Sequence, residues 1–135
     1  PIYSRCNPEV GDVLYIKDGA TTGVAAINRW VGEFSMLSSV ALLKPNRDEI
    51  TSEYLCGLLN SKQIKHRWTS QMAGGAIRRL TLTKIKAFEV PVVSMQAQIE
   101  FTTFVDKWWS MRSMITEALL QDIQLTESLQ STLLV

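Results

Sequence analysis

The C-terminal segment, residues 96–135, contains neither proline nor glycine, so no residue in it is expected to interrupt a helix. Large apolar residues recur there at spacings of three and four, which is the pattern of one apolar stripe along a helix. The stripe comprises Phe101, Phe104, Trp108, Met111, Ile115, Leu119 and Ile123. The segment therefore predicts one long helix whose apolar stripe requires a partner.

The predicted length of this helix limits where that partner can lie. At 1.5 Å per residue the helix extends on the order of 55–60 Å, whereas a compact domain formed by the preceding residues is only about 25–30 Å across. Packing against the rest of its own chain is one alternative, but it covers only the first few turns. We therefore expect residues 96–135 to form a spacer or dimerisation helix that pairs with another helix.

Residues 1–95 alternate short apolar runs with turn residues, which indicates strands and short helices. The expected strands are Val13–Ile16, Val24–Ile27 and Met36–Leu43, and the first two flank the polar loop Lys17–Gly23. The expected helices begin after Thr51, at Lys62, and after Thr81 or Thr83. The predicted fold class is α+β, with a small mixed, twisted β-sheet and short helices followed by the long coiled-coil-type helix.

Basic residues cluster in one stretch of the chain, although the net charge is only +1. No acidic residue occurs between Glu53 and Glu89. The basic residues of this stretch are Lys62, Lys65, Arg67, Arg78, Arg79, Lys84 and Lys86. Such a cluster is typical of a surface that meets the phosphates of a nucleic acid. On charge alone, a solvated basic face without a ligand is an equal alternative.

The residue groups that catalysis requires are not found in this sequence. His66 is the single histidine, and there is no nucleophile elbow, phosphate-binding glycine loop or cluster of metal ligands. Cys6 and Cys56 are expected to be idle thiols in a reducing cytoplasm, although one disulfide between them is possible. We therefore expect the chain to have no enzymatic activity of its own and to bind no metal and no cofactor. The apolar runs are also too short to span a bilayer.

Three stretches together carry a resemblance to a known family. Residues 10–23 have the sequence VGDVLYIKDGATTG, residues 74–81 have GGAIRRLT, and residues 96–100 have QAQIE at the start of the long helix. In this order and spacing they resemble the target-recognition domain and following spacer helix of type I restriction–modification specificity subunits. The resemblance extends from about Pro8 to about Leu125.

The resemblance implies a non-catalytic subunit that recognises double-stranded DNA and holds the methyltransferase and restriction subunits on it. Residues 1–95 would be the C-terminal portion of a target-recognition domain, and residues 96–135 the spacer helix. In the family such helices pair antiparallel, so a half-length chain is expected to form a homodimer or to pair with a homologous half. Pro1 at the start, and a short region before the GDVL motif, suggest a fragment or a processed chain.

The candidate DNA-binding residues lie in the loop and in the basic stretch. They are Lys17, Asp18, Thr21, Thr22, Lys65, Arg67, Arg78, Arg79, Lys84 and Lys86. Side chains on a loop held between two strands can be directed at base edges, and cations elsewhere can meet phosphates. The alternative function is a coiled-coil interaction module that binds protein and does not contact DNA directly.

Overall fold

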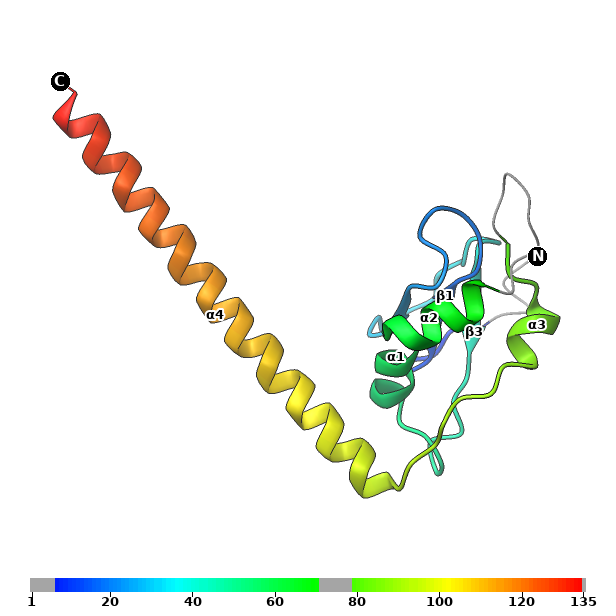
Figure 1. The fold of residues 1–135 in the computed structure, drawn as a ribbon. Coiled ribbons are helices and arrows are strands. Elements are labelled where there is room, and N and C mark those ends of the chain that lie inside the picture. Colours follow the sequence, from blue (N-terminus) through cyan, green and yellow to red (C-terminus); the bar gives the residue numbers. More distant parts are fainter. Residues whose placement is uncertain (1–6, 71–78, 135) are drawn as a thin grey trace. The chain divides into compact units, whose positions relative to one another are not determined.

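The computed structural model describes residues 7–70 and 79–134. The chain divides into two compact units, Pro1–Gln98 and Ile99–Val135. Among the described residues, the strands and the short helices lie in the first unit, and the second consists of the long helix after its first turn (Figure 1).

A three-stranded sheet lies at the centre of the first unit, with β1 (Val13–Ile16) between β2 (Ala25–Ile27) and β3 (Val40–Leu43). The α+β prediction is confirmed. Both strand pairs are antiparallel, whereas the sequence predicted a mixed sheet. The strand predicted over Met36–Leu43 begins only at Val40. A turn closed by the hydrogen bond from the Val40 amide to the Leu37 carbonyl precedes it.

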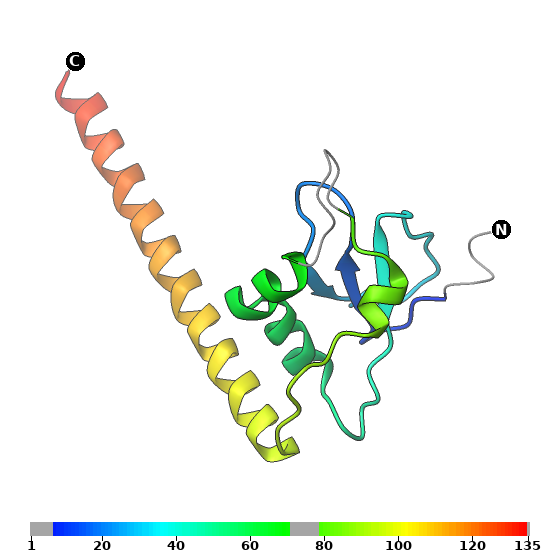
Figure 2. The same ribbon diagram turned by 45° about the vertical axis from the view of Figure 1, so that its right-hand side comes forward.

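Three short helices follow the sheet (Figure 2). They are α1 (Ser52–Asn60), α2 (Lys62–Thr69) and α3 (Leu82–Lys86). A hydroxyl residue directly precedes each helix, and its side chain accepts a hydrogen bond from a backbone amide of the first turn; these residues are Thr51, Ser61 and Thr81. Such caps satisfy amides that have no partner within the helix. The helix starts expected from the sequence are therefore confirmed, with Thr81 rather than Thr83 capping α3.

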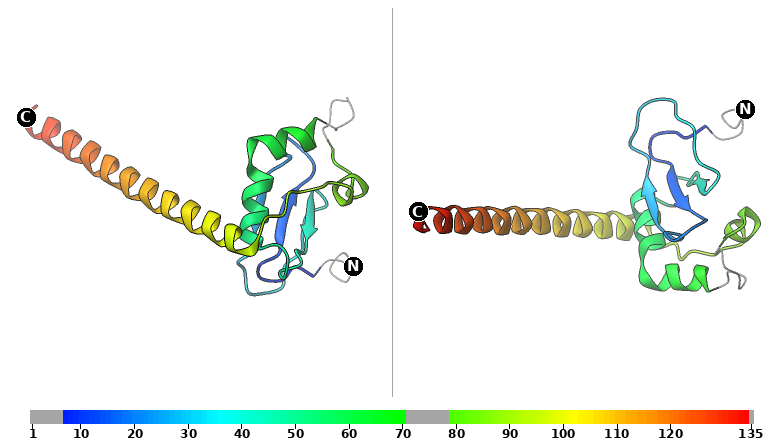
Figure 3. Two further views of the ribbon diagram at one scale, coloured as in Figure 1. Left: turned by 60° about the horizontal axis from the view of Figure 1, so that its bottom comes forward. Right: turned by 90° about the horizontal axis from the view of Figure 1, so that it is seen from above.

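The core of the first unit forms where α1 and α2 meet the sheet (Figure 3). Val13 and Tyr15 of β1 are almost wholly buried there, as is Leu59 of α1. A polar contact fixes α1 to the edge of the sheet, because the Asn60 side chain accepts from the Ala25 amide (3.0 Å) and donates to the Ala25 carbonyl (2.9 Å). This side chain therefore continues the hydrogen-bonding of β2 in the place of another strand.

The long helix α4 extends over Met95–Leu133, close to the start predicted at Gln96. The apolar residues of its stripe are exposed, from Phe101 through Ile123. Taken by itself, the second unit is a single helix, and a single helix cannot bury its own stripe. In the described part of the chain, no helix is long and apolar enough to cross a membrane.

Gln98, in the first turn of α4, is completely buried. Its Oε1 accepts from the amide of Thr51 (2.8 Å), the residue that caps α1. Its Nε2 donates to the carbonyls of Glu49 (2.8 Å) and Val93 (2.9 Å). One amide side chain therefore joins the start of α4 to the start of α1.

We expect Gln98→Ala to lower the free energy of unfolding by about 2–4 kcal/mol, because it removes partners from three backbone groups that are costly to leave unsatisfied. Chemical denaturation followed by circular dichroism measures this. Gln124→Ala, at an exposed position of the same helix, is the matched control and should change stability by less than about 0.5 kcal/mol. Equal effects of the two substitutions would contradict the role assigned to Gln98.

Candidate nucleic-acid interface

An aromatic stack fixes the basic elements to the sheet. Trp68 of α2 contacts Tyr15 of β1 edge-on, with ring centroids 5.5 Å apart, and stacks on Phe88 at 4.2 Å. Phe88 follows α3, so the indole of Trp68 lies between the central strand and the segment that carries α3. The stack therefore sets the positions of α2 and α3. These two helices carry most of the described cations of the basic stretch between Glu53 and Glu89.

The helix α2 carries three of these cations. Lys62 and Arg67 are exposed, and Lys65 is half-buried. The stem of Lys65 lies against Gly23, where a Cβ would come within 3.0 Å of the Lys65 Cγ. Gly23 also has a φ of 94°, a conformation that glycine adopts without strain. The close approach therefore holds α2 against the end of the polar loop.

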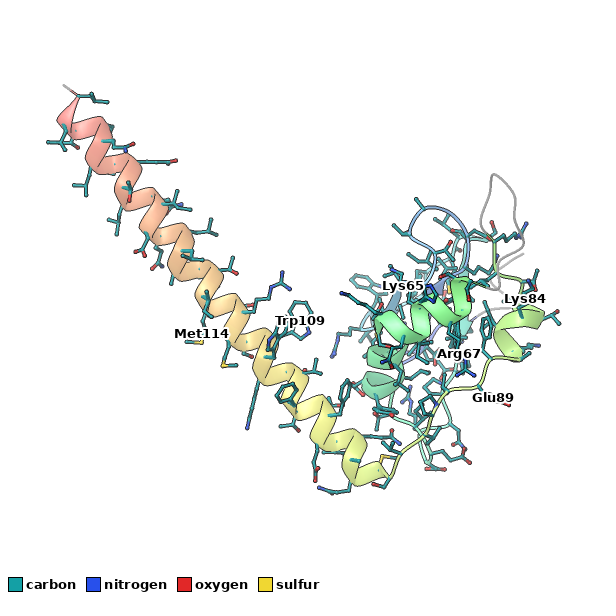
Figure 4. All side chains as sticks on the ribbon, viewed as in Figure 1. Lys65, Arg67, Lys84, Glu89, Trp109 and Met114 are labelled. Carbon is teal, nitrogen blue, oxygen red and sulfur yellow. The ribbon has the colours of Figure 1, made fainter. Side chains whose placement is uncertain are left out.

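Arg67 and Lys84 line a small cavity of about 160 Å³ between α2 and the segment around α3. Figure 4 shows the two residues on these separate elements, with Lys65 also on α2. Trp68 and Phe88 form part of the lining, and Glu89 adds an acidic group. Lys86 is exposed on α3. The fold thus brings Arg67 and Lys84, which are 17 residues apart in the sequence, to one cavity.

The polar loop presents fewer side chains to solvent than the sequence predicts. The hairpin closes through hydrogen bonds between Ile16 and Val24 and between Gly23 and Ile16. Thr22 is buried, and its hydroxyl donates to the Gly19 carbonyl (2.6 Å). Thr21 is exposed. Of the two loop threonines, only Thr21 presents its side chain to solvent.

Lys17 and Asp18 form an ion pair with each other, with Nζ and Oδ2 2.8 Å apart. The Lys17 side chain is buried and Asp18 is half-buried. Their backbone pairs with the second half of the GGAIRRLT motif, because Asp18 and Arg79 form an antiparallel bridge and the Leu80 amide donates to the Lys17 carbonyl (2.8 Å). Arg79 is therefore held next to the loop while its own side chain is largely exposed.

Of the site residues predicted from the sequence, Lys17 and Asp18 lie next to Arg79, and Arg67 and Lys84 line one cavity. Arg78 and the Gly74–Gly75 pair lie outside the described residues. Within the described ranges, Lys65, Arg67 and Lys86 form no ion pair, and the same holds for Lys62. Lys62 belongs to the basic stretch but is not among the DNA-binding residues that the sequence predicts. Its place in the first turn of α2, three residues before Lys65, is the signal that indicates a shared surface.

No constellation for catalysis emerges from the described part of the chain. His66 is exposed on α2, and no group of three metal-ligating side chains occurs among residues 7–70 and 79–134. Cys56 is a free, half-buried thiol, and burial raises its pKa. A raised pKa makes a thiol a poorer nucleophile at neutral pH. Cys6 lies outside the described residues.

The chain matches a known protein family. The sequence model of the family described as type I restriction modification DNA specificity domain matches residues 3–125. No curated protein matches the chain. The family match includes the sheet, the three short helices and most of α4.

We expect Tyr15→Phe to leave stability unchanged or to raise it by up to about 1 kcal/mol, because the Tyr15 hydroxyl is buried without a hydrogen-bond partner among the described residues. Burial also raises the pKa of Tyr15 from 10.0 to about 12. The unfolded chain therefore ionises first, and the wild type loses stability as pH rises from 10 to 12. The Tyr15→Phe variant should not show this loss of stability at alkaline pH, because it has no hydroxyl at this position to ionise.

Thermal denaturation at pH 7 and in alkaline buffers measures both effects. Tyr54→Phe is the matched control, because its hydroxyl donates to the Pro91 carbonyl (3.3 Å) and its loss should cost about 0.5–1.5 kcal/mol at pH 7. A larger loss for Tyr15→Phe than for Tyr54→Phe would contradict the prediction.

Proposed function

The chain belongs to the family of type I restriction modification DNA specificity domains, and on this basis we propose that its first unit binds a target sequence in double-stranded DNA. We also propose that the chain holds methyltransferase and restriction subunits on that target. Methyl transfer and ATP-driven cleavage belong, in this proposal, to those partners. The chain itself carries no reaction and needs no cofactor.

The observation that carries the proposal is the basic surface formed by α2 and α3. Cations on a phosphate backbone supply affinity that does not depend on sequence, because each contact releases counterions. Lys65, Arg67, Lys84 and Lys86 are assigned to this role, together with Lys62. Arg78 lies outside the described residues, and we assign it to phosphate contact because it belongs to the basic stretch of the sequence.

The loop is assigned to base recognition, with a division of roles between its residues. Thr21 is exposed and offers a hydroxyl that can donate and accept. Lys17 and Thr22 are buried, so we assign them to the shape of the loop rather than to contact with DNA. Asp18 and Arg79 lie together at the edge of the loop.

We expect Arg67→Gln combined with Lys86→Gln to weaken binding to duplex DNA of random sequence, because two phosphate contacts are lost. The slope of log affinity against log salt should fall in magnitude by up to about two. Fluorescence anisotropy over a series of salt concentrations measures both quantities with the full chain.

Arg29→Gln combined with Lys107→Gln is the control, since it removes the same charge from exposed positions outside α2 and α3. This control should leave the slope nearly unchanged. If both pairs of substitutions reduce the slope equally, net charge and not the basic surface governs binding. If the wild-type chain shows no salt-dependent binding, the alternative of a protein-interaction module replaces the DNA-binding function.

The helix α4 is assigned to pairing with a second copy of this chain or with a homologous helix. The exposed stripe includes Phe104, Trp108 and Ile115, and large aromatic side chains bury much apolar area in a contact. At roughly 25 cal/mol per Å², burial of several such side chains contributes several kcal/mol before the entropy of association is subtracted. A two-fold pairing satisfies the same stripe on both copies.

We expect the wild-type chain to be a dimer at micromolar concentration and Trp108→Glu combined with Ile115→Glu to be a monomer, because buried, unpaired carboxylates are costly. Sedimentation velocity distinguishes the two states. Ser113→Glu combined with Gln121→Glu adds the same charge on the opposite face of α4 and should leave the dimer intact. A monomeric wild type whose sedimentation neither pair of substitutions changes would rule out self-association through this stripe.

A further inference from the structure

The carboxylate of Asp18 lies between two cations of very different exposure. Its Oδ2 is 2.8 Å from Nζ of Lys17, whose side chain is only 8% exposed. Its Oδ1 is 3.2 Å from Nε of Arg79, whose side chain is 64% exposed. The second contact is an ion pair that falls short of an aligned hydrogen bond. Asp18 therefore compensates a buried charge on one side and contacts an exposed guanidinium on the other.

The backbone and the side chain of Arg79 are both held by the same hairpin. The bridge between Asp18 and Arg79, and the hydrogen bond from the Leu80 amide to the Lys17 carbonyl, fix the main chain. The ion pair is formed at Nε, and the terminal Nη groups carry further donors that can meet another partner. Within the described residues, Arg79 forms no other ion pair. A guanidinium restrained near a carboxylate in this way loses less freedom on binding than one that has no counter-ion.

The chemistry of a pre-oriented Nη pair fits two adjacent acceptors. In the major groove of DNA, guanine offers this pair as O6 and N7, and arginine recognises it with two parallel hydrogen bonds. A backbone phosphate also presents two acceptors. The carboxylate of Asp18 disfavours the phosphate, because it repels a second anion close to Arg79 and cancels part of the local positive charge. Asp18 therefore helps to orient the guanidinium of Arg79, but it weakens the attraction of Arg79 to a phosphate.

We propose that Arg79 reads a guanine in the major groove of the target, and that Asp18 is the positioning residue that directs its Nη groups. This inference rests on the proposed DNA-binding function and deepens it at one position of the target. Thr21, exposed on the same loop, lies outside the ion-pair cluster and is not required for this contact.

Selection from a library of duplexes with a randomised segment, followed by sequencing of the bound fraction, tests the proposal and identifies the target sequence in the same experiment. The full wild-type chain should enrich a motif with guanine at one position. Arg79→Lys retains the charge but lacks the planar pair of donors. It should reduce the preference for guanine at that single position about tenfold. Binding to random duplexes and its salt dependence should stay close to those of the wild type.

Asp18→Asn tests the positioning role, because it keeps the size of the side chain and removes its charge. It should weaken the preference for guanine at the same position and leave the other positions of the motif unchanged. Lys86→Gln is the control and should weaken binding to all sequences alike. Since Asp18→Asn leaves a buried lysine without its counter-ion, the unfolding curve of this variant is recorded beside the selection. If the variant unfolds, Arg79→Lys, at an exposed side chain, gives the answer.

The outcomes separate this inference from the function on which it rests. If Arg79→Lys binds with an unchanged motif, or loses affinity for all sequences alike, Arg79 does not read a base and the inference is wrong while DNA binding stands. If the wild-type chain enriches no sequence yet binds random duplexes, the inference is also wrong. If the wild-type chain binds no DNA at any salt concentration, the proposed function and the inference both fail.

Discussion

The burial of Trp68 between Tyr15 and Phe88 is the contact on which the arrangement of the first unit depends. A small three-stranded sheet has little apolar area of its own, so a large aromatic side chain that contacts both the central strand and a distant segment contributes much of the available burial. The same contact determines where α2 and α3 lie. The positions of the cations are therefore a consequence of packing in the core.

Polar side chains complete what apolar packing leaves open. Asn60 satisfies the edge of β2 at Ala25, and Gln98 satisfies the backbone at Thr51 and two carbonyls. Each uses a primary amide, which can donate and accept at once and can therefore replace a neighbouring strand or turn. These contacts give a small domain directional constraints that burial alone, which has no preferred direction, does not provide.

The loop after β1 combines a buried cation with an exposed one through a single carboxylate. A buried lysine is tolerated only with a counter-ion, and Asp18 supplies it at 2.8 Å from Lys17. That requirement also places a carboxylate next to Arg79. Asp18 thus has two roles. It is the counter-ion of the buried Lys17, and it orients the exposed Arg79.

Local signals in the sequence determined most of the secondary structure. A short apolar run next to turn residues located β1, the hydroxyl residues located the helix starts, and the segment without proline or glycine located α4. Each of these signals depends on neighbours within a few positions. The three motifs also indicated the family that the match over residues 3–125 shows. Only the tertiary structure decided that Lys17 is buried, that Asp18 meets Arg79, and that Lys84 lies near Arg67. These facts depend on pairing between segments far apart in the chain, and the burial of a lysine on a polar loop is decided by what packs over it, which no local pattern encodes.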